Sequence, residues 1–268
     1  MAAPKETSNA PRDAGDGPII RLKDVHKSFG ANHVLRGLSF EVPRGETLAI
    51  MGPSGTGKSV VLRHIIGLMK PDSGLVEVEG REVSKLSKKE LSELRKRMGF
   101  LFQEGALINW LNVGDNVALP LRENTNLSES EIRERVEHKL ALVKIPGTWE
   151  KLPSEISGGM KKRVGLARAL VTDPQIILYD EPNAGLDPEI SRSINELIRD
   201  VQHKLQVTSI VVEHRIPCIR TVADEVLFLE GGRALVQVPP DEFFNSNIPR
   251  LVQFLGPDSA ARANAQDQ

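Results

Sequence analysis

Apolar positions along the chain follow two alternating patterns. Short apolar runs predict buried strands, and longer stretches with apolar residues three and four positions apart predict helices. The predicted strands cover residues 19–25, 47–51, 75–78, 99–102, 176–179, 207–212 and 225–229, and the predicted helices cover 60–69, 129–143 and 161–171. Because strands alternate with helices, the pattern indicates an α/β fold with a largely parallel central sheet.

The strand signal disappears between residues 116 and 170. There the sequence ESEIRERVEHKLALV has helical spacing and follows Ser128, a residue type that caps helix N-termini. An inserted helical unit is therefore expected. Residues 1–18 contain several prolines and glycines, and residues 256–268 are rich in Ala, Asp, Gln and Asn. Both segments have little to bury and are expected to be flexible tails.

Composition and charge exclude several classes of protein. The 268 residues are 40% hydrophobic, with 35 basic and 36 acidic side chains and a net charge of −1, so no bulk charge attracts nucleic acid or anionic lipid. Apolar runs such as 48–51 are far shorter than the ~18–20 residues of a membrane helix. Residues 1–18 lack the apolar core of a signal peptide, which favours the cytosol. Cys218 is the only cysteine and is expected to be a free, inert thiol.

Residues 81–99 carry a local excess of basic side chains. They include Arg81, Lys85, Lys88, Lys89, Arg95, Lys96 and Arg97. A nucleic-acid or lipid face is one interpretation, and a solvated helix surface is the other. The second is favoured because charge runs of this kind usually cover exposed helices.

A glycine-rich segment after the predicted strand 47–51 carries the first chemical motif. Its sequence GPSGTGKS fits G-x-x-x-x-G-K-[ST] and precedes a helical stretch, which is the context of a phosphate-binding loop. Its glycines let backbone N–H groups face a phosphate, Lys58 reaches the β- and γ-phosphates and contributes to catalysis, and Ser59 binds Mg²⁺. The predicted nucleotide-binding segment comprises Gly52, Pro53, Ser54, Gly55, Thr56, Gly57, Lys58, Ser59 and Val60.

Two carboxylates follow the apolar strand 176–179. Asp180 and Glu181 are expected at the carboxyl edge of the sheet, where phosphate ligands bind. Asp180 is predicted to hold Mg²⁺, usually through water, and Glu181 to polarise the water that attacks the γ-phosphate.

The sequence ISGGM at residues 156–160, before the helix 161–171, resembles the signature of ABC ATPases, whose usual form is LSGGQ. Other family elements occur in the family's order. The resemblance assigns catalysis and metal binding to Gln103, catalysis to the switch histidine His214, and nucleotide contacts to the D-loop aspartate Asp187 and the adenine-stacking Phe29. Taken alone, Phe29 also fits a core position and His214 a structural one.

The resemblance spans residues 19–240 and implies one ABC nucleotide-binding domain. The implied fold is a P-loop NTPase with a mainly parallel RecA-like sheet, an N-terminal antiparallel β subdomain and a helical subdomain at about 104–171, followed by an extension at 241–268. It implies ATP and Mg²⁺ as cofactors and a head-to-tail homodimer. In that dimer Ser157, Gly158 and Gly159 complete the nucleotide site of the second copy.

Finer features resemble the ATPases of Mla- and Mce-type lipid transporters. These features are LFQEGAL at 101–107, NVALPL at 116–121, Met160 in the signature and PRLVQFL at 249–255. The resemblance implies a peripheral subunit at the cytoplasmic face of the inner membrane. Its implied partners are integral membrane permease subunits, an Mce-domain lipid-binding protein and a small cytosolic regulatory subunit. The segment 249–255 is further expected to reach the second copy of the dimer.

Some features depart from the family pattern, and other functions stay open. Glu213 and Arg215 flank the switch histidine, where the family commonly has Ser or Thr and then Asp. Within 105–119, Trp110 and its apolar neighbours fit either a permease-docking groove or core packing. The alternatives in function are an amino-acid, metal or cell-division cassette and a non-transport ABC ATPase. The single cassette and the net charge of −1 disfavour the last class.

Overall fold

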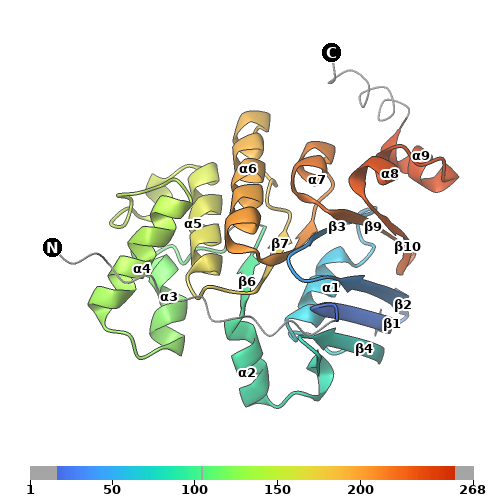
Figure 1. Ribbon diagram of the computed structural model, residues 1–268, viewed down its shortest axis with the longest axis horizontal. Coiled ribbons are helices and arrows are strands. Elements are labelled where there is room, and N and C mark those ends of the chain that lie inside the picture. Colours follow the sequence, from blue (N-terminus) through green and yellow to red (C-terminus); the bar gives the residue numbers. More distant parts are fainter. Residues whose placement is uncertain (1–16, 104, 257–268) are drawn as a thin grey trace.

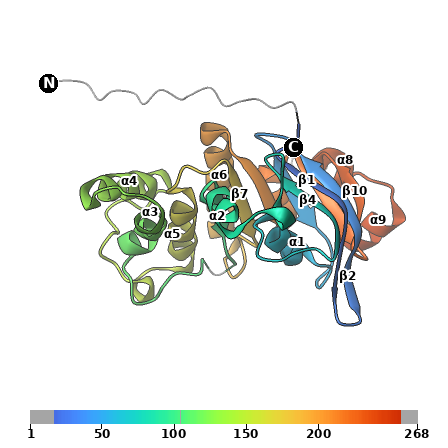
Figure 2. The same cartoon turned by 90° about the horizontal axis from the view of Figure 1, so that it is seen from below.

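The computed structural model describes residues 17–256 except residue 104. The two predicted tails therefore lie almost entirely outside the described residues. The described chain has a sheet-rich part and a helical lobe at opposite ends of its longest dimension (Figures 1 and 2).

A six-stranded sheet forms the centre of the molecule. In spatial order its strands are β10 (Arg233–Val238), β9 (Glu225–Glu230), β3 (Thr47–Met51), β8 (Thr208–Val212), β7 (Ile176–Asp180) and β6 (Met98–Leu101). The strands from β9 to β6 pair in parallel, and β10 pairs antiparallel with β9. All five residues of β3 and of β8 are buried, as continuous apolar strands covered on both faces should be.

A second, antiparallel sheet lies beside the first. Its order is β2 (Asn32–Val42), β1 (Ile20–Phe29), β4 (Ser73–Val78) and β5 (Arg81–Glu82). One face of this sheet packs in the same apolar cluster as α1 (Lys58–Ile65) and strands of the central sheet. The predicted mainly parallel core and N-terminal antiparallel sheet are both confirmed.

The helical lobe contains α3 (Val113–Asn124), α4 (Glu129–Leu142) and α5 (Gly158–Leu170), which pack on one another. Helix α4 begins at a capping box, because the Ser128 hydroxyl accepts the N–H of Glu131 while the Glu131 carboxylate accepts the N–H of Ser128. Two further helices lie outside this lobe: α2 (Lys88–Lys96), with mostly exposed basic residues, and α6 (Pro188–Leu205), which packs against α5 and α7 (Ile216–Val222). The exposure of α2 supports the interpretation of residues 81–99 as a solvated helix surface.

The segment after β10 is part of the core of this chain. Helices α8 (Pro240–Phe244) and α9 (Pro249–Leu255) place Phe243 and Leu251, both fully buried, in one cluster with Met51 and Phe228. The Phe254 ring also lies 4.9 Å from the Phe228 ring. Leu251, Phe254 and Leu255 therefore pack within their own chain, whereas Val252 is exposed, and the contact with a second copy stays a prediction.

Two further observations bear on the sequence-based expectations. Among the described residues, no helix is both long enough and apolar enough to cross a bilayer. The Cys218 thiol is free and buried, and burial raises its pKa, so it resists ionisation as an inert thiol should.

The packing of α9 predicts a stability difference between two neighbouring residues. Leu251→Ala should lower the free energy of unfolding by about 2–5 kcal/mol, because it leaves a cavity in the cluster beneath β9. Val252→Ala, at a side chain that is 49% exposed, is the matched control and should change it by less than about 0.5 kcal/mol. Urea unfolding of both variants measures the difference. Equal effects would show that α9 does not pack as described.

Candidate active site

The carboxyl ends of four parallel strands bring the predicted catalytic segments together. Strands β3, β8, β7 and β6 are adjacent and run in the same direction, so the segments that follow them lie at one edge of the sheet. These segments carry the glycine loop after β3, His214 after β8, Asp180 and Glu181 at the end of β7, and Gln103 after β6. Asp180 and Glu181 thus lie at the carboxyl edge, as expected, and the topology brings the other segments to the same edge.

The glycine loop between β3 and α1 depends on close backbone approaches. A Cβ on Gly52 would lie 2.2 Å from the Leu229 carbonyl oxygen, so no side chain fits there. Gly57, the N-cap of α1, has a φ of 98°, and a Cβ on it would lie 2.7 Å from the Val34 side chain. The loop therefore adopts its shape through glycines and presents the first turn of α1 at the sheet edge.

Lys58 turns back over the loop that precedes it. Its ammonium donates to the carbonyl oxygens of Gly52 at 2.8 Å and Pro53 at 2.9 Å, and the Thr56 hydroxyl also donates to the Pro53 carbonyl. Burial lowers the pKa of Lys58, while the negative charges of Glu181 and Asp180 oppose that shift. A partly desolvated cation therefore lies at the loop, where a phosphate would be its natural partner.

Ser59 and Asp180 form a direct contact across the site. The Ser59 hydroxyl donates to Asp180 Oδ1 at 3.0 Å. A hydroxyl and a carboxylate oxygen in contact suit Mg²⁺, which usually takes one or two protein ligands together with water and phosphate oxygens. A cluster of three or more acidic, His or Cys side chains, as an all-protein metal site would need, is absent from the described residues. The residues present therefore fit a nucleotide-associated Mg²⁺.

Glu181 and Gln103 meet through their side chains. The Gln103 amide donates to Glu181 Oε2 at 3.1 Å, which joins the segment after β6 to the end of β7. Glu181 has a φ of 48°, and its N–H donates to the Val212 carbonyl at 2.9 Å. A non-glycine residue in the left-handed region is strained, and such strain often occurs at functional sites.

Lys162 is a member of the site that the sequence analysis missed. This α5 side chain is only 4% exposed, and its ammonium donates to the backbone carbonyls of Gln103 and Glu181. It thereby connects the helical lobe to both catalytic candidates. The sequence contains two adjacent lysines, Lys161 and Lys162, and helical spacing alone does not show which of them turns inward.

His214 and Phe29 are accessible at the margins of the site. The His214 side chain is 57% exposed. The backbone N–H of His214 donates to Glu213 Oε1 at 2.8 Å. Phe29, 47% exposed, is the last residue of β1 and pairs with Asn32 at the tip of the β1–β2 hairpin. Since Val34 of the same hairpin contacts Gly57, an exposed ring near the glycine loop is available for stacking on a base.

The signature segment and Asp187 lie at the N-termini of α5 and α6. Ser157 is the N-cap of α5, and its hydroxyl accepts the N–H of Met160. Gly158 and Gly159 begin the helix, and a Cβ on Gly159 would lie 2.7 Å from Ile190 of α6. Asp187 caps α6 by accepting the N–H of Ile190. In both views β7 and α6 separate α5 from α1 (Figures 1 and 2), so the structure does not bring the signature residues of α5 to the glycine loop of the same chain.

A glycine loop before a helix, a Ser–Asp pair and a second carboxylate at the edge of a parallel sheet define a P-loop nucleotide-binding protein. A family model described as ABC transporter matches residues 35–184. The dimeric post-hydrolysis state of the ATP-binding cassette MJ0796, bound to ADP and Pi, has a TM-score of 0.76 and 32% identity to this chain over 82% of it and 98% of that chain. This chain therefore belongs to the ABC transporter family, and it is an ATP-hydrolysing member.

Three relatives differ in the transport system that their names describe. The chain is 44% identical to the probable ribonucleotide transport ATP-binding protein mkl of Mycobacterium leprae over 89% of this chain and 69% of that protein. It is 39% identical to the intermembrane phospholipid transport system ATP-binding protein MlaF of Haemophilus influenzae over 90% and 91%. It is 38% identical to the methionine import ATP-binding protein MetN of Brucella abortus over 92% and 68%.

The charge state of Asp180 predicts a pH-dependent stability difference. Burial raises the pKa of this carboxyl above its ordinary value of 3.8, although Ser59 and nearby cations oppose the shift. The folded protein thus binds that proton more tightly than the unfolded chain, and ionisation of Asp180 costs stability as the pH rises through this range. Asp180→Asn should therefore raise the melting temperature at neutral pH in the absence of nucleotide and metal.

Thermal unfolding of wild type and Asp180→Asn in EDTA across the pH range provides the measurement. The difference should shrink as the pH falls through the raised pKa of the folded carboxyl toward the ordinary value of 3.8, because the wild-type charge is then lost. Identical melting temperatures at every pH would contradict the assignment of Asp180 as a buried, costly charge.

Proposed function

We propose that this protein is the ATP-hydrolysing subunit of an Mla/Mce-type transporter that moves phospholipid for outer-membrane lipid homeostasis. The observation that carries the lipid assignment is the match to MlaF, which extends over about nine tenths of both chains. The signature SGGM and the segment PRLVQFL support the same assignment. The protein then acts as a peripheral subunit at the cytoplasmic face of the inner membrane.

The site suggests a role for each candidate residue in ATP hydrolysis. Backbone N–H groups of residues 52–60 and the Lys58 ammonium bind the phosphates, and the Phe29 ring stacks on adenine. Glu181 accepts a proton from the attacking water, Gln103 orients Glu181 through the hydrogen bond between them, and His214 contacts the γ-phosphate. Ser59, Asp180 and Gln103 hold Mg²⁺, which neutralises phosphate charge when bound.

The separation of the signature from the glycine loop supports a head-to-tail homodimer. Ser157, Gly158 and Gly159 lie at the start of α5, which β7 and α6 separate from α1 of the same chain, so we assign them, together with Asp187 at the start of α6, to the nucleotide of a second copy. ATP then contributes contacts to both copies, and hydrolysis removes them. Such a ligand shifts a two-state equilibrium between closed and open dimers.

The role of Glu181 can be tested with an isosteric substitution. Glu181→Gln should keep ATP binding but lower kcat by at least about 100-fold, because an amide cannot accept the proton. It should also accumulate an ATP-loaded dimer, measured by size exclusion with bound-nucleotide analysis. Normal turnover in this variant would remove Glu181 from its role as the base.

Permease docking is assigned to the segment that follows Gln103. Trp110 is 83% exposed, the most exposed of the large apolar side chains in the described part of the chain, whereas Leu107 packs against the helical core. The exposure of Trp110 supports docking for this residue, and the packing of Leu107 supports a core role for that one. A large ring exposed to water is typical of a residue that anchors a protein interface.

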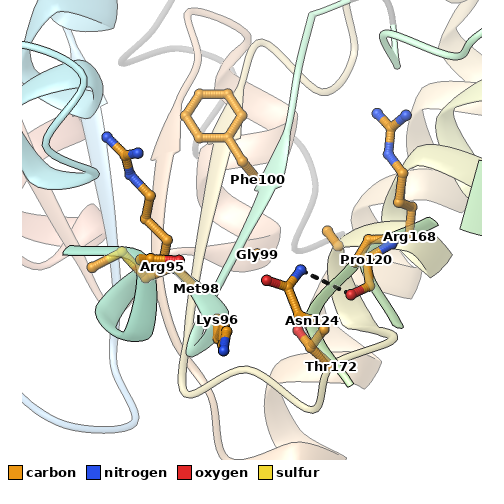
Figure 3. Close-up of a pocket in the computed structure, with 11 residues that line it drawn as sticks. Arg95, Lys96, Met98, Gly99, Phe100, Pro120, Asn124, Arg168 and Thr172 are labelled. Atoms are coloured by element: carbon orange, nitrogen blue, oxygen red, sulfur yellow. Dashed lines mark hydrogen bonds between the residues drawn. The ribbon is translucent and has the colours of Figure 1, made fainter. Parts of the chain in front are cut away.

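A cavity of about 300 Å³ lies between α2 and the helical lobe. Met98 and Phe100 of β6 line its floor, with Arg95 on one side and Pro120, Asn124 and Arg168 on the other (Figure 3). The Arg168 guanidinium donates to the carbonyls of Gly105 and Ala106, which connects the cavity wall to the segment that carries Trp110. The segment that carries Trp110 follows Gln103 directly along the chain. A cytoplasmic segment of the permease docked on it would therefore act on the nucleotide site through that residue.

Trp110→Ala should weaken assembly with the permease while leaving nucleotide binding by the isolated protein intact, because the ring makes no contact with the candidate site. The matched control is Leu235→Ala, which removes another exposed apolar side chain from β10 at the far end of the sheet. Co-purification with the permease provides the measurement. Equal recovery of the permease with Trp110→Ala and with wild type would contradict the proposed role of Trp110 in docking.

The second candidate function is the ATPase of an amino-acid importer, favoured by the similarity to MetN. Affinity purification of Glu181→Gln from native membranes, followed by mass spectrometry of proteins and lipids, separates the two. Recovery of a permease, an Mce-domain protein and phospholipid supports the lipid system, and a small cytosolic regulatory subunit would join the same complex. Recovery of a different permease without lipid keeps the ATPase and replaces the cargo.

A further inference from the structure

The residue before His214 is a buried carboxylate with an unusual set of partners. Glu213 is 1% exposed, and its Oε1 accepts the N–H of His214 at 2.8 Å and the N–H of Arg215 at 3.2 Å. A buried carboxylate is costly unless donors satisfy it. These two bonds therefore hold the backbone on both sides of the switch-histidine position in one conformation.

The second oxygen of Glu213 contacts the segment that follows Glu181. Asn183 is fully buried, and its amide nitrogen donates to Glu213 Oε2 at 3.2 Å and to Asn195 Oδ1 of α6 at 2.7 Å. Asn183 lies two residues after the candidate base. Glu213 thus links the His214 segment directly to the segment that begins at Glu181.

Arg215 makes a second connection between the same two segments. Its Nη1 donates to the Leu186 carbonyl at 3.2 Å and to the Ser191 hydroxyl at 2.8 Å. Leu186 immediately precedes Asp187, and Ser191 lies in the first turn of α6. The residues on either side of His214 are therefore attached to both ends of the segment between Glu181 and α6.

We propose that Glu213 and Arg215 are positioning residues that lock the His214 segment to residues 181–191, so that Glu181, His214 and Asp187 move as one unit. This inference rests on the proposed roles of those three residues. Neither Glu213 nor Arg215 needs to touch the nucleotide. Their hydrogen bonds set where the reacting side chains stand, and small misplacements of catalytic groups cost large factors in rate.

The same network links the two copies of the proposed dimer. Asp187 acts on the nucleotide of the second copy, whereas Glu181 and His214 act on the nucleotide of their own chain. With the three on one rigid unit, closure at one nucleotide site biases the catalytic geometry at the other. The two departures from the family pattern beside His214 thereby acquire a common physical role.

The test uses Arg215, because a truncation of the fully buried Glu213 can disrupt folding. Arg215→Met should lower kcat for ATP at least about tenfold while KM and the affinity for a non-hydrolysable ATP analogue stay within about twofold. Arg215→Lys, which can still donate one hydrogen bond, should recover most of the lost rate. The matched control is Arg220→Met in the same helix, where Arg220 pairs with Asp241 and packs on the Phe244 ring. It should leave kcat unchanged.

A double-mutant cycle shows whether the link to α6 is the cause. Ser191→Ala should lower kcat on its own, but it should lower kcat little further in the Arg215→Met background. The fold loss of kcat in the double variant should therefore be smaller, by about threefold or more, than the product of the two single losses. Independent effects that multiply, or equal losses of kcat and ligand affinity in Arg215→Met, would overturn the proposal.

Glu213→Gln provides a second route. The amide oxygen of the variant can still accept the N–H groups of His214 and Arg215. Its NH2 group, however, replaces the oxygen that accepts from the Asn183 amide, so two donors face each other. It should lower kcat about tenfold or more with the analogue affinity retained. Full activity in this variant would remove Glu213 from the positioning role.

Glu181→Gln separates a failure of this inference from a failure of the proposed function. If Glu181→Gln stops turnover but Arg215→Met behaves like wild type, the active site stands and the positioning role is wrong. If Glu181→Gln turns over normally, the assignment of the reacting residues fails, and the positioning role fails with it.

Discussion

The parallel pairing of the core strands β3, β8, β7 and β6 sets the positions of the candidate catalytic groups. Because these strands are parallel and adjacent, groups that are far apart in the sequence meet at one edge of the sheet. These groups are the loop before Lys58, the carboxylates Asp180 and Glu181, the amide of Gln103 and the imidazole of His214. The strands themselves are too apolar to carry chemistry. They place charged groups at the boundary between a dry sheet and an open ligand site, where electrostatic interactions are strong.

That boundary explains the balance of charge in the site. Lys58 and Asp180 have pKa values shifted toward their neutral forms by burial, and each opposes the shift of the other. Hydrogen bonds to carbonyls and to Ser59 satisfy them without ligand. A nucleotide with Mg²⁺ would add charges opposite to those of Lys58 and Asp180, so part of its binding energy would relieve a cost that the folded chain already carries. Active sites commonly trade stability for function in this way.

Three polar links connect the catalytic edge to other parts of the fold. Lys162 connects this edge to the helical lobe, and Gln103 connects it to β6 beside the cavity. The Glu213–Asn183 contact continues to α6 through the hydrogen bond from Asn183 to Asn195. Each link uses hydrogen bonds from a buried or half-buried group, which are directional and costly to break. A movement of the lobe, of a docked permease or of a second copy therefore reaches the reacting groups through short, identifiable contacts.

The candidate catalytic motifs of this protein are visible in its sequence alone. The phosphate loop, the carboxylates after β7 and the family-specific elements depend on residue types at short spacings, so they are visible without a fold. The seven predicted strands follow from short apolar runs. Three features were not visible in the sequence. They are the half-exposed strands β2 and β10, the inward turn of Lys162 rather than Lys161, and the packing of Leu251 and Phe254 against β9. Only the tertiary structure decided these features, because each depends on which side chain meets a partner far away in the sequence.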